Sequence, residues 1–367
     1  MRGRSDRVAA ARIFREEAER AGFSRVGIAR AMEPPGFHRF TEWIAAGRHA
    51  GMRYLERTAG VRSSPEKLLP GVRSIVCLAA PHRVERLAAS DGSAIGRYAA
   101  GPDYHGTLRS RATRAARSAV ERIGRSVRWR VCVDSTPIAE RSFAAAAGLG
   151  WIGKNGCLID RELGSYLLLA EILTDVDLPA DEPVAELCGS CVRCLESCPT
   201  DAFVAPGFLD ANRCIAYWTI EHRGVVPDDV KPALAEHVFG CDVCQEVCPW
   251  NPPIRRAGIG NRKRGIEESD PASISDRPPI SGGSGVPTRA EWLDMGPGEW
   301  RRRFGATALN RAGRRGLQRN AAVSAGATSD LAVLPALPRA AHTLDRGLSD
   351  AARWAARLLD ERIERTP

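Results

Sequence analysis

The chain of 367 residues lacks any long uninterrupted apolar stretch. No run of uncharged apolar residues approaches the roughly 18 that a membrane-spanning helix needs. The first residues, MRGRSDRVAAARIF, also lack the apolar core of a secretory signal and a twin arginine. We therefore expect a soluble, cytoplasmic protein that does not associate with membranes. The length suggests about two or three domains.

Acidic residues are outnumbered by basic ones. The sequence has 44 Asp and Glu against 53 Lys and Arg, a net charge of +9. This balance is compatible with a polyanionic partner, although an arginine-rich composition can also reflect genomic bias. Between residues 301 and 329 there is no acidic residue, and there are seven arginines: Arg301, Arg302, Arg303, Arg311, Arg314, Arg315 and Arg319. A solvated helix face is the usual interpretation of a charge run, but clustering of one sign is what contacts with RNA phosphates require.

Cysteine, by contrast, is abundant, with eleven residues in the chain. The run CGSCVRCLESCP at residues 188–199 has the spacing of bacterial ferredoxins, in which the fourth cysteine ligates the other cluster. The run CDVCQEVCP at residues 241–249 supplies three more thiols, and one cysteine stands alone between the runs. We therefore predict two 4Fe–4S clusters, the first held by Cys188, Cys191, Cys194 and Cys248 and the second by Cys198, Cys214, Cys241 and Cys244.

Zinc is the alternative metal, because C-x2-C pairs also bind zinc. A zinc ribbon explains neither the additional cysteines of each run nor the proline that follows each last cysteine. Iron–sulfur clusters need a reducing compartment, which also argues against disulfides. Cys77, Cys132 and Cys157 lie outside the pattern beside apolar or aromatic residues, and we expect them to be buried thiols.

The apolar pattern divides the chain into segments. Helices are expected over residues 7–21 and 106–123, and strands over 74–80, 127–134 and 164–173, so that residues 1–180 predict an α/β domain. Residues 181–255 carry the cluster cysteines and predict a ferredoxin-like domain, and residues 256–287, rich in Gly, Pro and Ser, predict a linker. Residues 288–367 are helical again, with weakly similar helix pairs that suit HEAT-like repeats. The predicted class is therefore α+β with several domains.

Polar chemistry outside the cysteines is concentrated in VDSTPIAER, residues 133–141, and in the glycines that follow. Gly148 to Gly153 match G-x-G-x-x-G, but a helix rather than a strand is expected before them, which disfavours a dinucleotide site. We expect these glycines to form a loop close to a large ligand. Asp134 lies at the carboxyl end of a predicted strand, where open α/β sheets tend to place functional groups. An isolated aspartate is, however, more often a cap or a turn residue.

Several motifs, in this order, carry a family resemblance: GMRYLER (51–57), RYAAGPDYH (97–105), VDSTPIAER (133–141), GLGWIGKN (148–155), CIAYWTIEHRG (214–224) and R-x4-R-N (314–320). With these motifs and its cysteine order, the chain resembles the epoxyqueuosine reductases. The resemblance implies a cobalamin-dependent oxidoreductase with two clusters that reduces epoxyqueuosine to queuosine at wobble position 34 of tRNA, the last step of queuosine biosynthesis. It also implies a cobalamin-binding α/β domain, a ferredoxin-like domain and C-terminal HEAT-like helices that bind tRNA.

The resemblance also implies roles for individual residues. Asp134 matches the proton donor that the departing epoxide oxygen needs, provided that burial or the corrin raises its pKa. Contacts with cobalamin are expected from Arg57, Arg97, Tyr104, His105, Asp134, Arg141, Lys154, Asn155, Ser165 and Trp218, and contacts with RNA from Arg311, Arg314, Arg315 and Arg319. Arg97 lies near where relatives can place a residue below cobalt. Because arginine is not a soft ligand, cob(II)alamin is expected to rest without a protein thiolate or imidazole on its metal.

Two other functions are open at this point. A corrinoid reductive dehalogenase also combines cobalamin with two clusters, but it usually carries a twin-arginine signal and has no evident use for an arginine-rich tail. A ferredoxin-type electron-transfer protein would not need the long α/β segment that precedes the clusters. We expect a monomer that takes electrons from an external donor and acts on tRNA bearing epoxyqueuosine.

Overall fold

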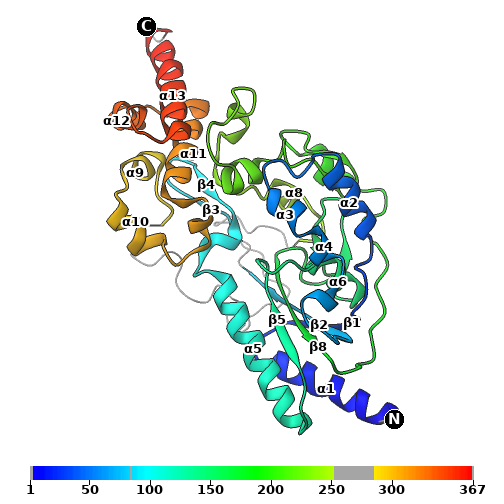
Figure 1. Ribbon diagram of the computed structural model, residues 1–367. Coiled ribbons are helices and arrows are strands. Elements are labelled where there is room, and N and C mark those ends of the chain that lie inside the picture. Colours follow the sequence, from blue (N-terminus) through cyan, green and yellow to red (C-terminus); the bar gives the residue numbers. More distant parts are fainter. Residues whose placement is uncertain (1–2, 83–84, 252–284, 366–367) are drawn as a thin grey trace, which may run out of the picture.

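The computed structural model describes residues 3–82, 85–251 and 285–365, and it divides into a sheet-containing region, a cysteine-bearing region and a helical region (Figure 1). Most of the linker predicted for residues 256–287 lies outside the described residues. None of the helices in the described ranges combines the length and the apolar character that crossing a membrane requires.

The first region is built on a four-stranded sheet in the order β1-β2-β8-β5. Its strands are β1 (Arg25–Arg30), β2 (Ser74–Pro81), β8 (Leu167–Thr174) and β5 (Trp129–Cys132). The predicted strands are confirmed, and so is the mixture of helices and strands. Every neighbouring pair is antiparallel, however. The rule for the carboxyl ends of parallel strands, which singled out Asp134, therefore does not apply to this sheet.

Helices cover both faces of the sheet (Figure 1). They are α1 (Arg4–Arg20) and α5 (Tyr104–Ile123) on one face and α6 (Glu140–Ala146) on the other. Side chains alternate along a strand, so Val76 and Leu78 of β2 pack toward α1 and α5, whereas Ile75 and Cys77 pack toward α6. Burial on both faces explains why the sequence of β2 is apolar throughout. Short helices α2 (Phe37–Ala45), α3 (Arg53–Arg57) and α4 (Ala59–Arg62) lie between β1 and β2 in the chain.

The glycine-rich loop connects α6 to a two-stranded hairpin of β6 (Trp151–Ile152) and β7 (Leu158–Ile159). The helix expected before the glycines is present. A Cβ added at Gly150, whose φ is +156°, would lie 2.1 Å from the Ile159 carbonyl oxygen, and one at Gly148 would lie 2.7 Å from that of Glu182. These glycines are needed because the loop packs against the protein's own backbone, and the large ligand that we predicted close to the loop stays a prediction.

The cysteine-bearing region consists of short elements: α7 (Arg193–Glu196), β9 (Phe203–Ala205), β10 (Phe208–Leu209), a π-helical turn (Tyr217–Glu221), β11 (His237–Phe239) and α8 (Val243–Glu246). Strand β11 pairs in parallel with β4 (Ala94–Ile95), which pairs with β3 (Leu87–Ala88). A small sheet is thus shared between residues that we assigned to separate domains, 1–180 and 181–255.

The C-terminal region is entirely helical where it is described. It contains α9 (Arg289–Asp294), α10 (Pro297–Phe304), α11 (Gly313–Thr328), α12 (Leu337–Ala341) and α13 (Arg346–Arg365). Helix α11 is central and packs against α9, α13 and β11. One hydrophobic core runs from these helices into the cysteine-bearing region and includes Leu317 and Val323 of α11 together with Trp218 and Phe239.

Arg319 and Asn320 join the helical region to the cysteine-bearing region. Arg319 is 3% exposed and donates hydrogen bonds to the carbonyl oxygens of Trp218, at 2.8 Å, and His222, at 3.0 Å. Burial lowers its pKa to about 10. We predicted that Arg319 contacts RNA phosphates, but its guanidinium lies inside the protein and is used by carbonyl groups there. Trp218, predicted at the cobalamin, is also buried and donates from Nε1 to the Asn212 carbonyl oxygen.

Asn320 tests this junction. Its Nδ2 donates to the carbonyl oxygens of Thr219 and Val238, both at 2.8 Å. Asn320→Ala leaves these buried carbonyls without their donor, so we expect the free energy of unfolding to fall by roughly 2–4 kcal/mol. Urea unfolding followed by tryptophan fluorescence measures the change. The exposed Asn310 is the matched control, and Asn310→Ala should change stability by less than about 0.5 kcal/mol. Equal stabilities of the two variants would contradict a role for Asn320 in the junction.

Candidate active site

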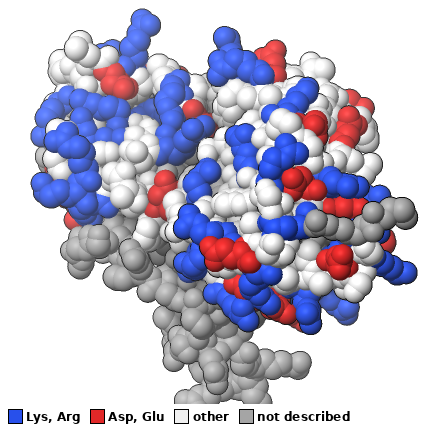
Figure 2. All heavy atoms as spheres, turned by 60° about the horizontal axis from the view of Figure 1, so that its bottom comes forward, with Lys and Arg blue, Asp and Glu red and all other residues white. Residues whose placement is uncertain are grey.

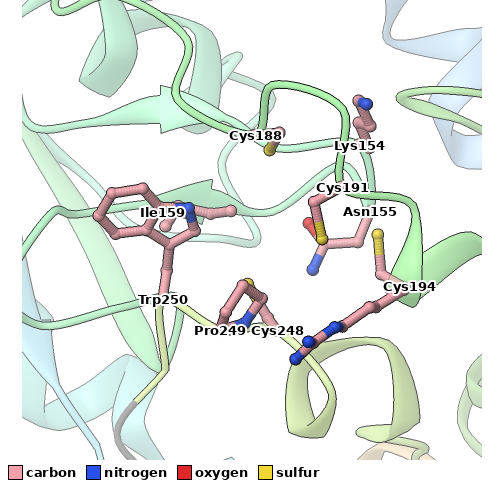
Figure 3. Close-up of a pocket in the computed structure, with 10 residues that line it drawn as sticks. Lys154, Asn155, Ile159, Cys188, Cys191, Cys194, Cys248, Pro249 and Trp250 are labelled. Atoms are coloured by element: carbon pink, nitrogen blue, oxygen red, sulfur yellow. The ribbon is translucent and has the colours of Figure 1, made fainter.

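Cysteines of both runs surround one cavity (Figure 3). The cavity is lined by Cys188, Cys191 and Cys194 of the first run and by Cys248 of the second, together with Lys154, Asn155, Ile159, Arg193, Pro249 and Trp250. Helices α7 and α8, which carry Cys194 and Cys244, pack against one another and bring the runs together. Trp151 donates from Nε1 to the sulfur of Cys188 at 3.4 Å. This donor set is the one that we predicted for the first cluster.

The remaining pattern cysteines influence one another as a second group. Burial, followed by the charges of Cys214 and Cys198 among others, raises the pKa of Cys241 to about 12. Burial also raises the pKa of Cys244 well above its usual range, with Cys241 and Cys214 among the further causes. The sulfur of Cys198 accepts a hydrogen bond from the Ala202 amide at 3.3 Å. Buried thiols of this kind become thiolates when a metal offsets the loss of hydration, which fits a cluster.

No three His, Cys, Asp or Glu side chains in the described part of the chain converge closely enough to hold a single metal ion. The thiols of the first group instead line the wall of a cavity, from segments more than fifty residues apart. Thiols spread around a cavity suit a cubic 4Fe–4S cluster, because each thiolate binds a different iron atom of the cube.

Four of the residues for which we predict contacts with cobalamin lie among the cysteine loops. Arg97 is 1% exposed and donates to Glu246 at 2.6 Å and to Asp242 at 3.3 Å. Lys154 donates to the Gly189 carbonyl oxygen, Asn155 to that of Cys244, and Ser165 to Gln245. These side chains hold the loops of the two cysteine runs in place, so their principal contacts are within the protein. Arg97 in particular is fixed by carboxylates of the second run.

Asp134 lies outside this region, directly after β5, with a φ of +36°. Its carboxylate accepts a hydrogen bond from the Tyr104 hydroxyl at 2.9 Å and is in close contact with Nε2 of His105. The other ring nitrogen of His105 contacts Asp103, and the Tyr104 and His105 rings stack with centroids 4.1 Å apart. The D-Y-H and VDSTPIAER motifs, separate in the sequence, therefore form one polar group.

The hydrogen bonds of this group determine where its charges lie. Although burial acts in the opposite direction, hydrogen bonds from His105 and Tyr104 hold the pKa of Asp134 below its usual range. The hydrogen bond with Asp134 raises the pKa of His105 to about 9, with Asp103 adding to the effect. The acid role implied for Asp134 required a raised pKa, whereas the residues around Asp134 lower it. At neutral pH the proton instead resides on the imidazolium of His105, held against an ionised Asp134. This ion pair should persist from above the lowered pKa of Asp134 up to about pH 9.

An arginine of the helical region, Arg311, influences the charge of Asp134. Arg311 is 53% exposed, binds Glu221 at 2.7 Å and lies over the ring of Tyr54. Its charge also lowers the pKa of Asp134, so this residue, predicted to contact RNA, lies near the candidate active site. Arg141 donates to the Gly156 carbonyl oxygen and Arg57 is exposed at the end of α3.

The sequence analysis did not identify Tyr54 and Glu140 as residues near Asp134. Both lie inside motifs that carried the resemblance, GMRYLER and VDSTPIAER. Tyr54 senses the charge of Asp134, and Glu140 accepts a hydrogen bond from the Asp134 amide. Motif membership was the available signal, but it did not indicate which residues of each motif face Asp134.

The cavity in Figure 3 predicts which cysteine variants resemble one another. Cys194→Ser and Cys248→Ser should damage one cluster, although these residues are far apart in sequence. Cys198→Ser and Cys244→Ser should damage the other. Iron analysis and electron paramagnetic resonance of the anaerobically purified variants should therefore give matching spectra within each pair. Matching spectra for the neighbours Cys194 and Cys198 would mean that the ligands are not shared between the runs.

Comparison with known proteins gives matches to family models, to a curated relative and to a solved structure. A family model described as a 4Fe-4S double cluster binding domain matches residues 187–251, and one described as epoxyqueuosine reductase QueG, DUF1730 matches residues 62–135. The epoxyqueuosine reductase of Xanthomonas campestris is 36% identical over 355 residues, 95% of each chain. A selenomethionine-labelled crystal structure of an epoxyqueuosine reductase superposes with a TM-score of 0.80 at 28% identity, covering 96% of this chain and 92% of that one.

A second solved structure, of an epoxyqueuosine reductase with an epoxyqueuosine-modified tRNA-Tyr stem loop, has a TM-score of 0.77 at 27% identity and covers 96% of this chain and 93% of that one. The similarity extends over nearly the whole length of the chain in sequence and in fold, and it includes the double-cluster segment. The chain belongs to the epoxyqueuosine reductase family.

Proposed function

We propose that this protein removes the epoxide oxygen of epoxyqueuosine at the wobble position of tRNA, leaving queuosine, with electrons relayed through two 4Fe–4S clusters. One observation carries the proposal: cysteines of two separate runs share a cavity in a chain of the epoxyqueuosine reductase family. A relative that binds an epoxyqueuosine-modified stem loop supports the substrate. Membership of this family favours the reductase over the dehalogenase and ferredoxin alternatives.

The reaction sets the requirements for the site. Removing the epoxide oxygen breaks two carbon–oxygen bonds, forms a carbon–carbon double bond and releases water, which consumes two electrons and two protons. Clusters transfer single electrons, and the pair of them suits a two-electron reduction. The departing oxygen is a poor leaving group unless it is protonated, so the site needs a positioned acid.

Cobalamin is the further cofactor that we propose, and when bound it supplies a low-valent cobalt centre able to attack or reduce the epoxide. The residues predicted to contact it form two groups. Arg57, Tyr104, His105, Asp134 and Arg141 keep polar groups exposed or half-buried around Asp134 or on elements near it, which suits a large ligand with a polar edge. The others, described above, are engaged inside the protein and would act by holding the loops between the cofactors.

Asp134 and His105 supply the acid. The imidazolium of His105 carries a proton at neutral pH, and its Nε2 is in close contact with the Asp134 carboxylate, which is half exposed. Asp134 can therefore receive the proton from His105 and present it to the departing oxygen. Tyr104 fixes the carboxylate through its hydroxyl group. In this account Asp134 does not need a raised pKa, because the histidine stores the proton.

The helical region is the proposed surface for tRNA. Figure 2 shows Lys and Arg gathered on the lobe at the left, with few acidic residues among them. Arg315, Arg301 and Arg302 are exposed, and Arg314 is half-buried against the Met295 carbonyl oxygen. We infer that helices α9 to α13 form the HEAT-like, tRNA-binding domain predicted for residues 288–367. We further expect a monomer that works in the cytoplasm with an external electron donor.

Asp134→Asn tests the acid. The amide still accepts from Tyr104 but cannot carry the proton, so turnover should fall by roughly 10²–10⁴-fold, the usual contribution of general acid catalysis. Conversion of an epoxyqueuosine-bearing stem loop, followed by mass spectrometry of its nucleosides, measures turnover. Iron content and RNA affinity should stay at the parental level. Ser135→Ala changes the same loop without touching the acid and should keep parental activity. Activity of Asp134→Asn within about threefold of the parent would reduce Asp134 to a turn residue.

Arg314 and Arg315 test the RNA surface. Each arginine that contacts a phosphate releases counterions from the RNA when tRNA binds. The double variant Arg314→Ala/Arg315→Ala has lost two such contacts, so it should release fewer counterions and bind tRNA more weakly. The plot of log affinity against log salt should flatten by somewhat over one unit, at about 0.7–0.9 per contact. The exposed Arg12 and Arg128 of the sheet-containing region are the control pair. If both double variants give the parental slope, the helical region is not part of the RNA surface.

A further inference from the structure

A second carboxyl group lies directly behind Asp134. Glu140 is the first residue of α6, and its carboxylate accepts a hydrogen bond from the Asp134 backbone amide. Burial, followed by the charge of Asp134, raises the pKa of Glu140 to about 7. Arg141 of the same helix and Arg62 of α4 face it and act in the opposite direction. Close to neutral pH, Glu140 is therefore protonated in a large fraction of molecules.

A third carboxyl group, that of Glu171, lies on the sheet against which α6 packs. Glu171 of β8 pairs in register with Cys77 of β2 on one side and Cys132 of β5 on the other. It is fully buried, and neither carboxyl oxygen has a hydrogen-bond partner among the described residues. An ionised carboxylate without a partner is strongly disfavoured there. Burial, then the charges of Glu140 and Asp134, accordingly raises the pKa of Glu171 well above its usual range, so Glu171 stays neutral.

The reaction needs more protons than the His105–Asp134 pair holds. Each turnover consumes two protons and two electrons, and the clusters account for the electrons. The His105–Asp134 pair holds one proton, which leaves as the departing oxygen is first protonated. A second proton must reach the same carboxylate before water can form. Glu140 is hydrogen-bonded to the Asp134 backbone, and its pKa of about 7 lets it release a proton at neutral pH, unlike the Tyr104 hydroxyl, whose pKa is raised far above that range.

We propose that Glu140 is the proton reserve of the site, a positioning residue that returns a proton to the Asp134–His105 pair after the first has been used. The inference rests on the proposed function. The balance is complete: both carbon–oxygen bonds break, two oxygen–hydrogen bonds form in water, one proton comes from His105 and the other from Glu140. Both residues then recover their protons from solvent. Glu171 stays neutral behind Glu140 and does not take part.

Glu140→Gln tests the reserve. The amide oxygen still accepts from the Asp134 backbone, but the titrating group is gone. In the parent, kcat should fall as pH rises through about 7, since the protonated form of Glu140 is the active one. In Glu140→Gln this decline should disappear, and kcat at neutral pH should be lower by roughly ten- to a hundredfold. A parental pH profile and a parental kcat in Glu140→Gln would overturn the inference.

Glu171→Gln is the matched control, since it replaces a neighbouring buried carboxyl by the same amide. It should keep the decline near pH 7 in kcat. The inference would be overturned if the decline of kcat near pH 7 were lost in Glu171→Gln and kept in Glu140→Gln. The proton reserve would then be Glu171 and not Glu140.

Infrared titration provides a readout that does not depend on the reaction. In the purified protein without tRNA, a protonated carboxyl band should disappear with a midpoint near pH 7, be absent from Glu140→Gln and persist in Glu171→Gln. A band that is unchanged in Glu140→Gln would overturn the inference while leaving the proposed function intact. Failure of the parent to reduce epoxyqueuosine, with this band present, would instead count against the proposed function.

Discussion

The meeting of the two cysteine runs is the constraint on which the rest of the structure depends. Thiols from segments far apart in the chain must come within reach of one cluster, in surroundings where burial opposes their ionisation. Two sets of contacts achieve this: α7 packs against α8, and a residue of the first region holds the second cysteine run in place. Arg97, which comes from the first region, neutralises Asp242 and Glu246 between the cysteines of that run.

In the function that we propose, protons and electrons are supplied from different elements. The cysteine loops lie on one side, and the proton-holding group of Tyr104, His105 and Asp134 lies where α5 begins and β5 ends. Asp134 occupies a left-handed backbone conformation, so its carboxylate can turn back toward His105 instead of following the strand. Because the histidine bears the charge, the aspartate can act as an acid while remaining ionised at rest.

Local patterns in the sequence predicted the features that depend on spacing. The grouping of the first three cysteines of one run with Cys248 of the other was predictable because the spacing is that of bacterial ferredoxins, in which the fourth cysteine ligates the other cluster. The strands were predictable because β2 and β8 are apolar along nearly their whole lengths, with Glu171 of β8 as the charged exception. The antiparallel pairing was not predictable, because alternating helices and strands suit either direction. Neither was the contact between Tyr104, His105 and Asp134, which depends on how α5 packs beside β5.

Charge was the least reliable guide to position. Arg315 and Arg319 lie in the same arginine run, yet one is exposed and the other is buried under carbonyl groups of the π-helical turn region. The sequence contains no signal for this difference, because it depends on which face of α11 meets the cysteine-bearing region. Arg97 is a similar case, since its carboxylate partners lie about 150 residues further along the chain. Family resemblance pointed to the correct motifs but did not distinguish residues that face a ligand from those that hold the loops.

We propose that electrons held by this protein remove an oxygen atom from a modified tRNA base, and this reaction is open to direct measurement. It is tested most directly by loading the anaerobic protein with clusters and cobalamin, reducing it with a counted number of electrons, and mixing it with an epoxyqueuosine-bearing stem loop. Mass spectrometry then follows the modified nucleoside. The account predicts the loss of one oxygen atom for every two electrons delivered, with queuosine as the product. Reoxidation of the protein with no change in the mass of the nucleoside would contradict it.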